Sequence, residues 1–183
     1  MTSILEKLYN TAKDFIDEKK WGINADNAIL TLQQLEEAHP KIVQDPNHPT
    51  WNDPLVTKNS EYDAKTNTIH IRPGYDIEND PTYNVIHEKC HAYLTQIAKL
   101  NTKTLMSLQP YPTQALEQVA YTTEFYYWIK DGHSLEELKA TEEFSYFFEK
   151  YGDVLTKYYD YAQKKYNEEQ AQIALSKVNS NNR

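Results

Sequence analysis

The chain has 183 residues, of which 25% are charged and 39% hydrophobic, and this suits one domain with its own core. Its formal charge of −8 argues against binding a nucleic-acid backbone through a general electrostatic field, and its single cysteine, Cys90, excludes an internal disulfide. The first residues lack the apolar core of a signal peptide, and no apolar run approaches the roughly 20 residues that span a bilayer. We therefore expect a cytoplasmic protein with no membrane or nucleic-acid partner, although leaderless secretion would leave the same signature.

The N-terminal part of the chain combines helical patterns with a proline-rich segment. Apolar residues recur at helical spacing over residues 1–20, which predicts an amphipathic helix. A second helix is predicted to begin after Asn24 or Asp26, either of which could cap it, and to end before Pro40. Proline, asparagine and aspartate repeatedly interrupt residues 40–54, so we expect a long loop there.

Two short strands and a central helix are predicted next. Residues 55–57 and 68–71 are β-like and are joined by a polar stretch, so we expect two strands, with 68–71 at an edge of the sheet. Asp80 and Pro81 then favour a helix start, with a carboxylate at the N-cap and a proline at the first helical position. The apolar spacing predicts that this helix runs from 81 to about 101.

Two more helices follow a second proline-rich break. Thr113 could cap the first of them, which should continue to a stop at 131–132, an Asp-Gly pair. Ser134 and Glu137 have the spacing of a capping box. They predict a helix that ends near Gly152.

The chain should end in a helix rich in tyrosine and lysine, from residue 153 to about 177. Together these elements predict an α+β fold that is mostly helical, with a small sheet and additional C-terminal helices. We expect a single domain over residues 1–183, in which 1–54 supply N-terminal helices and a loop. Residues 55–132 then form the core around the sheet, and 133–183 form a helical extension.

The segment NVIHEKCHAYL places the pattern HExxH inside the predicted central helix. On a helix, His87 and His91 lie one turn apart on the same face, so two imidazoles can reach one ion. A catalytic zinc ion takes three protein ligands and leaves a fourth position for water. Glu88 is rotated by about 100° from His87 and can reach that water as a general base. The motif therefore predicts a Zn²⁺ site with His87 and His91 as ligands and Glu88 as the catalytic residue.

The third metal ligand should come from the following helix. Glu117 lies 26 residues after His91, and Glu124 is two turns further along roughly the same face. The two glutamates are about 10 Å apart along the axis, so one of them at most can bind the metal. We favour Glu117, with Ala120 as a small residue that lets the two helices approach closely. Glu124 is then an acceptor for a ligand imidazole, the alternative ligand, or a surface charge.

A short strand, then a helix bearing HExxH, then ExxA on the next helix resembles the ImmA/IrrE-type metallopeptidases. The resemblance covers roughly residues 55–130. It implies a compact, gluzincin-like zincin fold, a bound zinc ion, and an enzyme that cleaves or inactivates transcriptional repressors. The matching positions in this chain are His87, Glu88, His91 and the segment 117–120, EQVA.

Catalysis would also require a donor for the oxyanion that forms when water attacks a carbonyl. Zincins commonly use tyrosine, histidine or arginine in this role. Cys90 falls on the apolar side of its predicted helix, so we expect a buried side chain and not a ligand. The candidate oxyanion donors are Tyr121, His133, Tyr75 and Tyr111.

These patterns predict a zinc-dependent metalloendopeptidase with a protein or peptide substrate. An extended substrate would lie along the strand at 68–71 by strand addition. A zinc-binding regulatory or interaction domain without turnover is the alternative, although a carboxylate beside the water position favours an enzyme. A third interpretation is an α-rich domain with no metal, in which the HExxH spacing is accidental.

Overall fold

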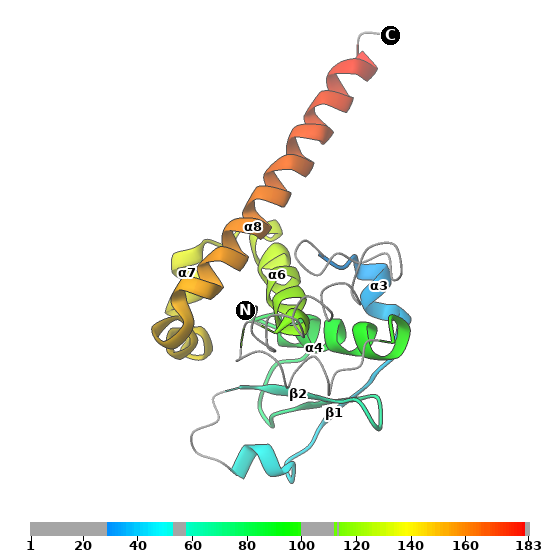
Figure 1. The fold of residues 1–183 in the computed structure, drawn as a ribbon, viewed down its shortest axis with the longest axis vertical. Coiled ribbons are helices and arrows are strands. Elements are labelled where there is room, and N and C mark those ends of the chain that lie inside the picture. The colour runs from blue at the N-terminus through cyan, green and yellow to red at the C-terminus, as the bar shows by residue number, and fades with distance from the viewer. Residues whose placement is uncertain (1–28, 53–57, 100–111, 113, 182–183) are drawn as a thin grey trace, which may run out of the picture.

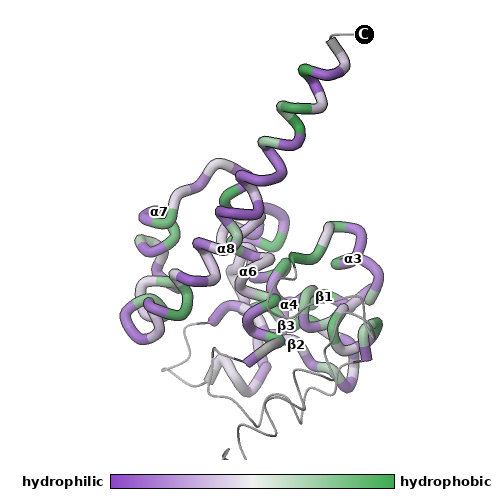
Figure 2. Tube along the Cα trace, turned by 45° about the horizontal axis from the view of Figure 1, so that its top comes forward, coloured by the Kyte–Doolittle hydropathy of each residue, from purple (hydrophilic) through white to green (hydrophobic). Residues whose placement is uncertain are grey.

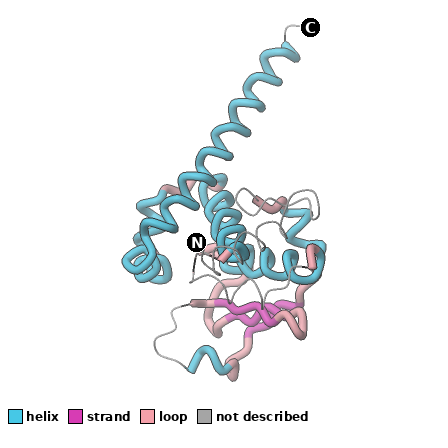
Figure 3. Tube along the Cα trace, in the orientation of Figure 1, coloured by secondary structure: helices cyan, strands magenta, loops and turns pink. Residues whose placement is uncertain are grey.

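The computed structural model describes residues 29–52, 58–99, 112 and 114–181. Within these ranges the fold is α+β and mostly helical, as predicted, with a small three-stranded sheet at one end and the helices beside it (Figures 1 and 3). The predicted helix over 1–20 lies outside the described residues. None of the helices among the described residues has the length and apolar character needed to cross a membrane.

Helix α3 spans Leu32–Glu37 and is closed at its N-terminus by a capping box. The hydroxyl of Thr31 accepts a hydrogen bond from the backbone N–H of Gln34, whose side chain accepts one from the backbone N–H of Thr31. The predicted caps, Asn24 and Asp26, lie outside the described residues. The helix ends before the proline at position 40, as predicted.

The sheet consists of β1 (Lys41–Gln44), β2 (Ser60–Asp63) and β3 (Thr68–Ile71), in the order β1-β3-β2. β1 is parallel to β3, and β2 is antiparallel to it. The prediction of a loop over 40–54 was wrong, because this segment holds β1 and a short 3-10 helix, Pro49–Asn52. The prediction that 68–71 is an edge strand was also wrong, because β3 is the central strand.

Pairing with β3 explains the two strands that were not predicted. β1 carries Ile42 and Val43 and lies between the prolines at positions 40 and 46. β-branched residues favour extended backbone once a partner strand supplies hydrogen bonds. β2 pairs Ser60 with Ile71, so alternate residues of this polar strand face the same side as the buried isoleucine. The predicted strand at 55–57 lies outside the described residues.

Helix α4 spans Asn84–Ala92 and carries the HExxH residues. It begins later than predicted: the N-cap is Tyr83, and Asp80 precedes it in a turn with a positive φ of 39°. The carboxylate of Asp80 still reaches the helix N-terminus, where it accepts hydrogen bonds from the backbone N–H groups of Val85 at 3.0 Å and Ile86 at 3.4 Å. Asp80 therefore satisfies the N-terminal amide groups of α4 from outside the helix.

α4 continues directly into η2 (Tyr93–Ile97), a π-helical segment, and the next described helix is α6 (Ala115–Lys130). The N-cap of α6 is Gln114, and its side chain makes no capping hydrogen bond, while the predicted cap, Thr113, lies outside the described residues. α6 ends where predicted. Gly132 follows with a φ of 90°, a conformation that glycine adopts without strain.

Helix α7 (Leu135–Ala140) begins with the predicted capping box between Ser134 and Glu137. The helix was predicted to continue to about residue 152, which was wrong. Thr141 has extended backbone angles and separates α7 from the next helix. The Thr141 hydroxyl then accepts a hydrogen bond from the backbone N–H of Phe144, which caps that next helix.

Helix α8 spans Glu142–Asn181 and is kinked at Tyr151. Tyr151 has non-helical backbone angles, φ −129° and ψ 19°, so two helical segments meet there, and the predicted boundary near Gly152 is confirmed. Its C-terminal part extends away from the rest of the described structure (Figure 1), and the side chains of residues 171–180 are exposed. Polar and apolar residues are mixed along this extension (Figure 2).

Three buried clusters hold these elements together and place α4 between the sheet and α6. The first includes Cys90 and Ala120, both fully buried, so the prediction of a buried Cys90 is confirmed. The second joins α6, α7 and α8 around Phe125 and Phe144. The cluster between the sheet and α4 consists of Ile69, Ile71 and Val85.

Candidate metal centre

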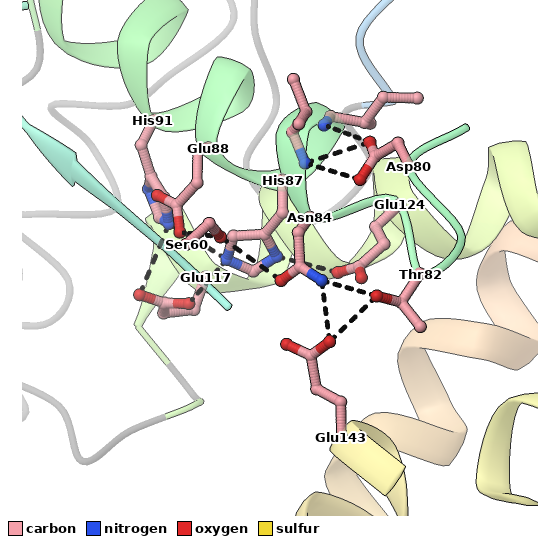
Figure 4. A network of polar contacts seen from close by, with 12 residues as sticks. Ser60, Asp80, Thr82, Asn84, His87, Glu88, His91, Glu117, Glu124 and Glu143 are labelled. Carbon is pink, nitrogen blue, oxygen red and sulfur yellow. Dashed lines mark hydrogen bonds and ion pairs between the residues drawn. The ribbon is translucent and has the colours of Figure 1, made fainter. Parts of the chain in front are cut away.

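Helices α4 and α6 bring three of the predicted ligand residues into one group (Figure 4). Nε2 of His87 lies 3.2 Å from Nε2 of His91. Oε2 of Glu117 lies 3.4 Å from Nε2 of His87, and Oε1 of Glu117 lies 3.6 Å from Nε2 of His91. One ligand atom from each residue lies within 4.8 Å of the others, so this group could hold a metal ion.

The spacing of these atoms fits tetrahedral coordination. Two ligands at about 2.0–2.1 Å from a tetrahedral ion are about 3.3–3.4 Å apart. The two Nε2 atoms are 3.2 Å apart, close to that value, and each oxygen of Glu117 faces a different imidazole, at 3.4 and 3.6 Å. Two imidazole nitrogens and the carboxylate of Glu117 can therefore face one small divalent ion.

The other nitrogen of His87 contacts Glu124. Nδ1 of His87 lies 2.8 Å from Oε2 of Glu124, whose side chain is buried. Burial lowers the pKa of His87, but its contacts with Glu117 and Glu124 outweigh this and raise the pKa well above the ordinary value. Burial raises the pKa of Glu124, although the hydrogen bond and the charge of His87 act to lower it. The contact with Glu124 therefore fixes a proton at Nδ1, and an ion that binds His87 does so at Nε2, where it displaces any proton.

Glu117 and His91 differ from this pair in their electrostatics. Burial alone would raise the pKa of Glu117, but the two histidines lower it to about 2. Burial lowers the pKa of His91, in spite of the nearby carboxylates. Glu117 is thus an ionised carboxylate beside a neutral imidazole, and both forms are the ones that bind divalent metals.

Glu88 lies on α4 next to His87, and its side chain is 7% exposed. Its Oε1 accepts a hydrogen bond of 2.9 Å from the hydroxyl of Ser60 on β2. Ser60 pairs with Ile71 in the sheet and so faces α4. The sequence did not single out Ser60, because it lies in a polar stretch without apolar alternation.

A pocket of about 240 Å³ opens beside this group. Its wall comes from β2, α4, α6 and the first turns of α8, and it contains the candidate ligands and Glu88. This volume is below that of pockets that enclose a drug-sized molecule and suits one side chain or the end of a peptide. Other residues that line it are Lys58, Glu61, Tyr62, Leu116, Glu143, Phe144 and Phe147.

The structure separates the predicted oxyanion donors. Tyr121 lines the pocket, and its ring lies edge-on to His87, with 4.6 Å between ring centroids. His133 follows the C-terminus of α6 and packs on Trp128, which lies about 16.5 Å along the axis from Glu117 at 1.5 Å per residue, so the fold does not bring it to the pocket. Tyr75 donates its hydroxyl to Asp80 outside the pocket, and Tyr111 lies outside the described residues.

A second polar cluster at the pocket involves Glu143, which the sequence did not reveal. Its Oε2 accepts hydrogen bonds from Asn84 Nδ2 at 2.7 Å, Thr82 Oγ1 at 2.9 Å and Asn59 Nδ2 at 3.1 Å. Burial raises the pKa of Glu143, against the effect of these donors. Asn84, one of the donors to Glu143, lies one helical turn before His87 on α4. This spacing places Asn84 on the same helix face as the ligand, and it was the available sequence signal for the cluster.

Comparison of the chain with protein-family models, with curated proteins and with solved structures gives no match. The resemblance to ImmA/IrrE-type metallopeptidases therefore depends on the HExxH and ExxA segments alone.

Proposed function

We propose that this protein is a zinc-dependent metallopeptidase of the zincin type, with His87, His91 and Glu117 as the zinc ligands. The observation that carries this proposal is the convergence of two Nε2 atoms, 3.2 Å apart, with the carboxylate of Glu117, whose two oxygens lie 3.4 and 3.6 Å from them. Two nitrogens and one carboxylate oxygen are a ligand set that zinc uses in hydrolases. Three protein ligands also leave one position open, as catalysis requires and as a closed structural site would not.

Glu88 would act as the general base. A bound zinc ion would polarise the substrate carbonyl and lower the pKa of water. The Ser60 hydroxyl engages Oε1 of Glu88, which leaves Oε2 to take a proton from the attacking water and pass it to the leaving amine. Because Ser60 belongs to β2, the sheet fixes the direction of this carboxylate.

Glu124 supports the ligand His87. Its contact with Nδ1 fixes the ring orientation and the tautomer, as carboxylates commonly do for histidines that bind zinc. Tyr121 packs edge-on against the same ring and restricts its rotation. Tyr121 also lines the pocket, which neither Tyr75 nor His133 does, so it is the oxyanion donor that we propose among the described candidates.

The substrate would be a peptide segment that enters the pocket between β2 and α6. β3 is the central strand, so the proposed strand addition moves to β2, an outer strand of the sheet that the described residues form. β2 also contributes Ser60, Glu61 and Tyr62 to the pocket wall. The resemblance to ImmA/IrrE-type enzymes would make a transcriptional regulator the natural substrate.

Cleavage of an unbiased peptide library tests this function. Zinc-loaded wild-type protein should cleave a subset of the peptides, read by mass spectrometry. Glu88→Gln should keep the zinc and lose cleavage by roughly 10²–10⁴-fold, because it removes the general base. Glu36→Gln, which neutralises an exposed carboxylate that pairs with Lys89 on α4, should leave cleavage unchanged. Zinc binding without cleavage in the wild type would instead favour a regulatory zinc domain.

A further inference from the structure

Glu143 is a buried carboxylate that has no cationic partner among the described residues. Its side chain comes from α8, and the residue is 8% exposed. All three groups that donate to it, from Asn59, Thr82 and Asn84, are neutral. A buried carboxylate costs free energy unless a positive charge compensates it.

The other glutamates of the pocket already have a role or a partner. Glu117 and Glu124 contact imidazole nitrogens, and Glu88 accepts the hydroxyl of Ser60. Glu61 forms an ion pair of 3.0 Å with Lys58. Glu88 and Glu143 both accept only from neutral donors, and Glu143 is the one of the two that the proposed metal centre does not use.

The two oxygens of Glu143 have different surroundings. The three donors all bond to Oε2, and within the described part of the chain no donor contacts Oε1. Figure 4 shows Oε1 directed away from Asn84 and Thr82. Since Glu143 lines the pocket, Oε1 is the atom available to a bound molecule.

We propose that Glu143 binds the ammonium group of a peptide substrate and so places a cationic residue next to the metal centre. This inference rests on the proposed peptidase function and names the substrate class. Phe144 and Phe147 line the same pocket and would pack against the aliphatic part of that residue. The ammonium group is either the substrate N-terminus or a lysine side chain, and the carboxylate recognises both by the same charge-assisted hydrogen bond.

Binding of three hydroxamate probes to the zinc-loaded protein tests the inference without requiring turnover. Nα-acetyl-norleucine hydroxamate carries no cation, and norleucine hydroxamate carries an α-ammonium group. Nα-acetyl-lysine hydroxamate carries a side-chain ammonium group. Calorimetry should show that one cationic probe binds wild type about tenfold to a hundredfold more tightly than the neutral probe, the range of a hydrogen bond to a charged group. The preferred probe identifies the source of the ammonium group.

Glu143→Gln should remove this preference while the neutral probe keeps its affinity. Glu142→Gln, the same change at the exposed preceding residue of α8, should retain the preference. Equal binding of all probes to wild type, or a preference that survives Glu143→Gln, overturns the inference and leaves the metal site standing. Failure of the neutral probe to bind any variant overturns the proposed metal centre itself, and the inference with it.

Discussion

His87 is held at both of its ring nitrogens by glutamates of one helix. Nδ1 lies 2.8 Å from Oε2 of Glu124, and Nε2 lies 3.4 Å from Oε2 of Glu117. The two glutamates are two turns apart on α6 and lie on opposite sides of the imidazole. One helix thus supplies both a candidate ligand for the ion and the group that orients another ligand.

Glu124→Gln should weaken zinc binding without abolishing it. The amide cannot accept the Nδ1 proton as strongly as the carboxylate does, so the affinity should fall by about 10–100-fold. Competition with a fluorescent zinc chelator measures this change. Gln118→Ala, a change next to Glu117 on the same helix, is the control and should bind zinc as the wild type does. An unchanged affinity in Glu124→Gln would show that the contact with His87 does not support the metal.

Ser60→Ala should reduce peptide cleavage and keep the zinc content. It removes the hydrogen bond that fixes Oε1 of Glu88, and a loss of about tenfold in kcat corresponds to a hydrogen bond to a charged group. Thr66→Ala is the control. It removes a hydroxyl that donates to Asp63, the last residue of β2, at the opposite end of the strand from Ser60, and it should leave kcat unchanged. Equal kcat in wild type and Ser60→Ala would remove Ser60 from the positioning of the base.

Asp80→Ala should lower the free energy of unfolding by about 1 kcal/mol, the usual value of a helix N-cap. Its carboxylate accepts the backbone N–H groups of Val85 and Ile86 at the start of α4. Urea unfolding measures the change. Glu78→Ala removes an exposed carboxylate in the preceding loop and should alter stability by no more than about 0.5 kcal/mol. Equal stability of the two variants would mean that water caps α4 as well as Asp80 does.

Ala120→Leu should destabilise the fold and also weaken zinc binding. Ala120 is fully buried in the cluster that joins α6 to α4, so a larger side chain must push the two helices apart. Overpacking of this kind costs about 1–3 kcal/mol.

Ala162→Leu is the matched control for this substitution. Ala162 is equally buried, but it lies in the cluster between α6 and α8 and away from the metal centre. It should cost similar stability while zinc affinity stays at the wild-type value. Equal loss of zinc affinity in both variants would show that general destabilisation, and not the separation of α4 and α6, controls the site.

The sequence was most informative where a helical period determines geometry. The one-turn spacing of His87 and His91, and the position of Glu117 on the following helix, led to the group that the structure brings together. The capping box at Ser134 and the stop at Gly132 were also predicted, because local backbone chemistry decides them.

The remaining features depend on contacts between distant segments. β1 and β2 contain few apolar residues, and they form strands because β3 offers them hydrogen bonds on both sides. Glu143 lies at the start of α8, more than 50 residues after the HExxH motif, and the packing of α8 against α6 brings it to the pocket. The spacing of apolar residues along the sequence does not predict contacts between such distant segments.

Zinc content by elemental mass spectrometry, on wild type, Glu117→Ala and Gln118→Ala purified without added metal, shows whether the three candidate ligands hold zinc. We expect about one zinc ion per chain in the wild type, since one tetrahedral site takes one ion, and a loss of zinc in Glu117→Ala while Gln118→Ala retains it. A wild-type protein that contains no zinc even after zinc is supplied would contradict the metal centre and the peptidase proposal together.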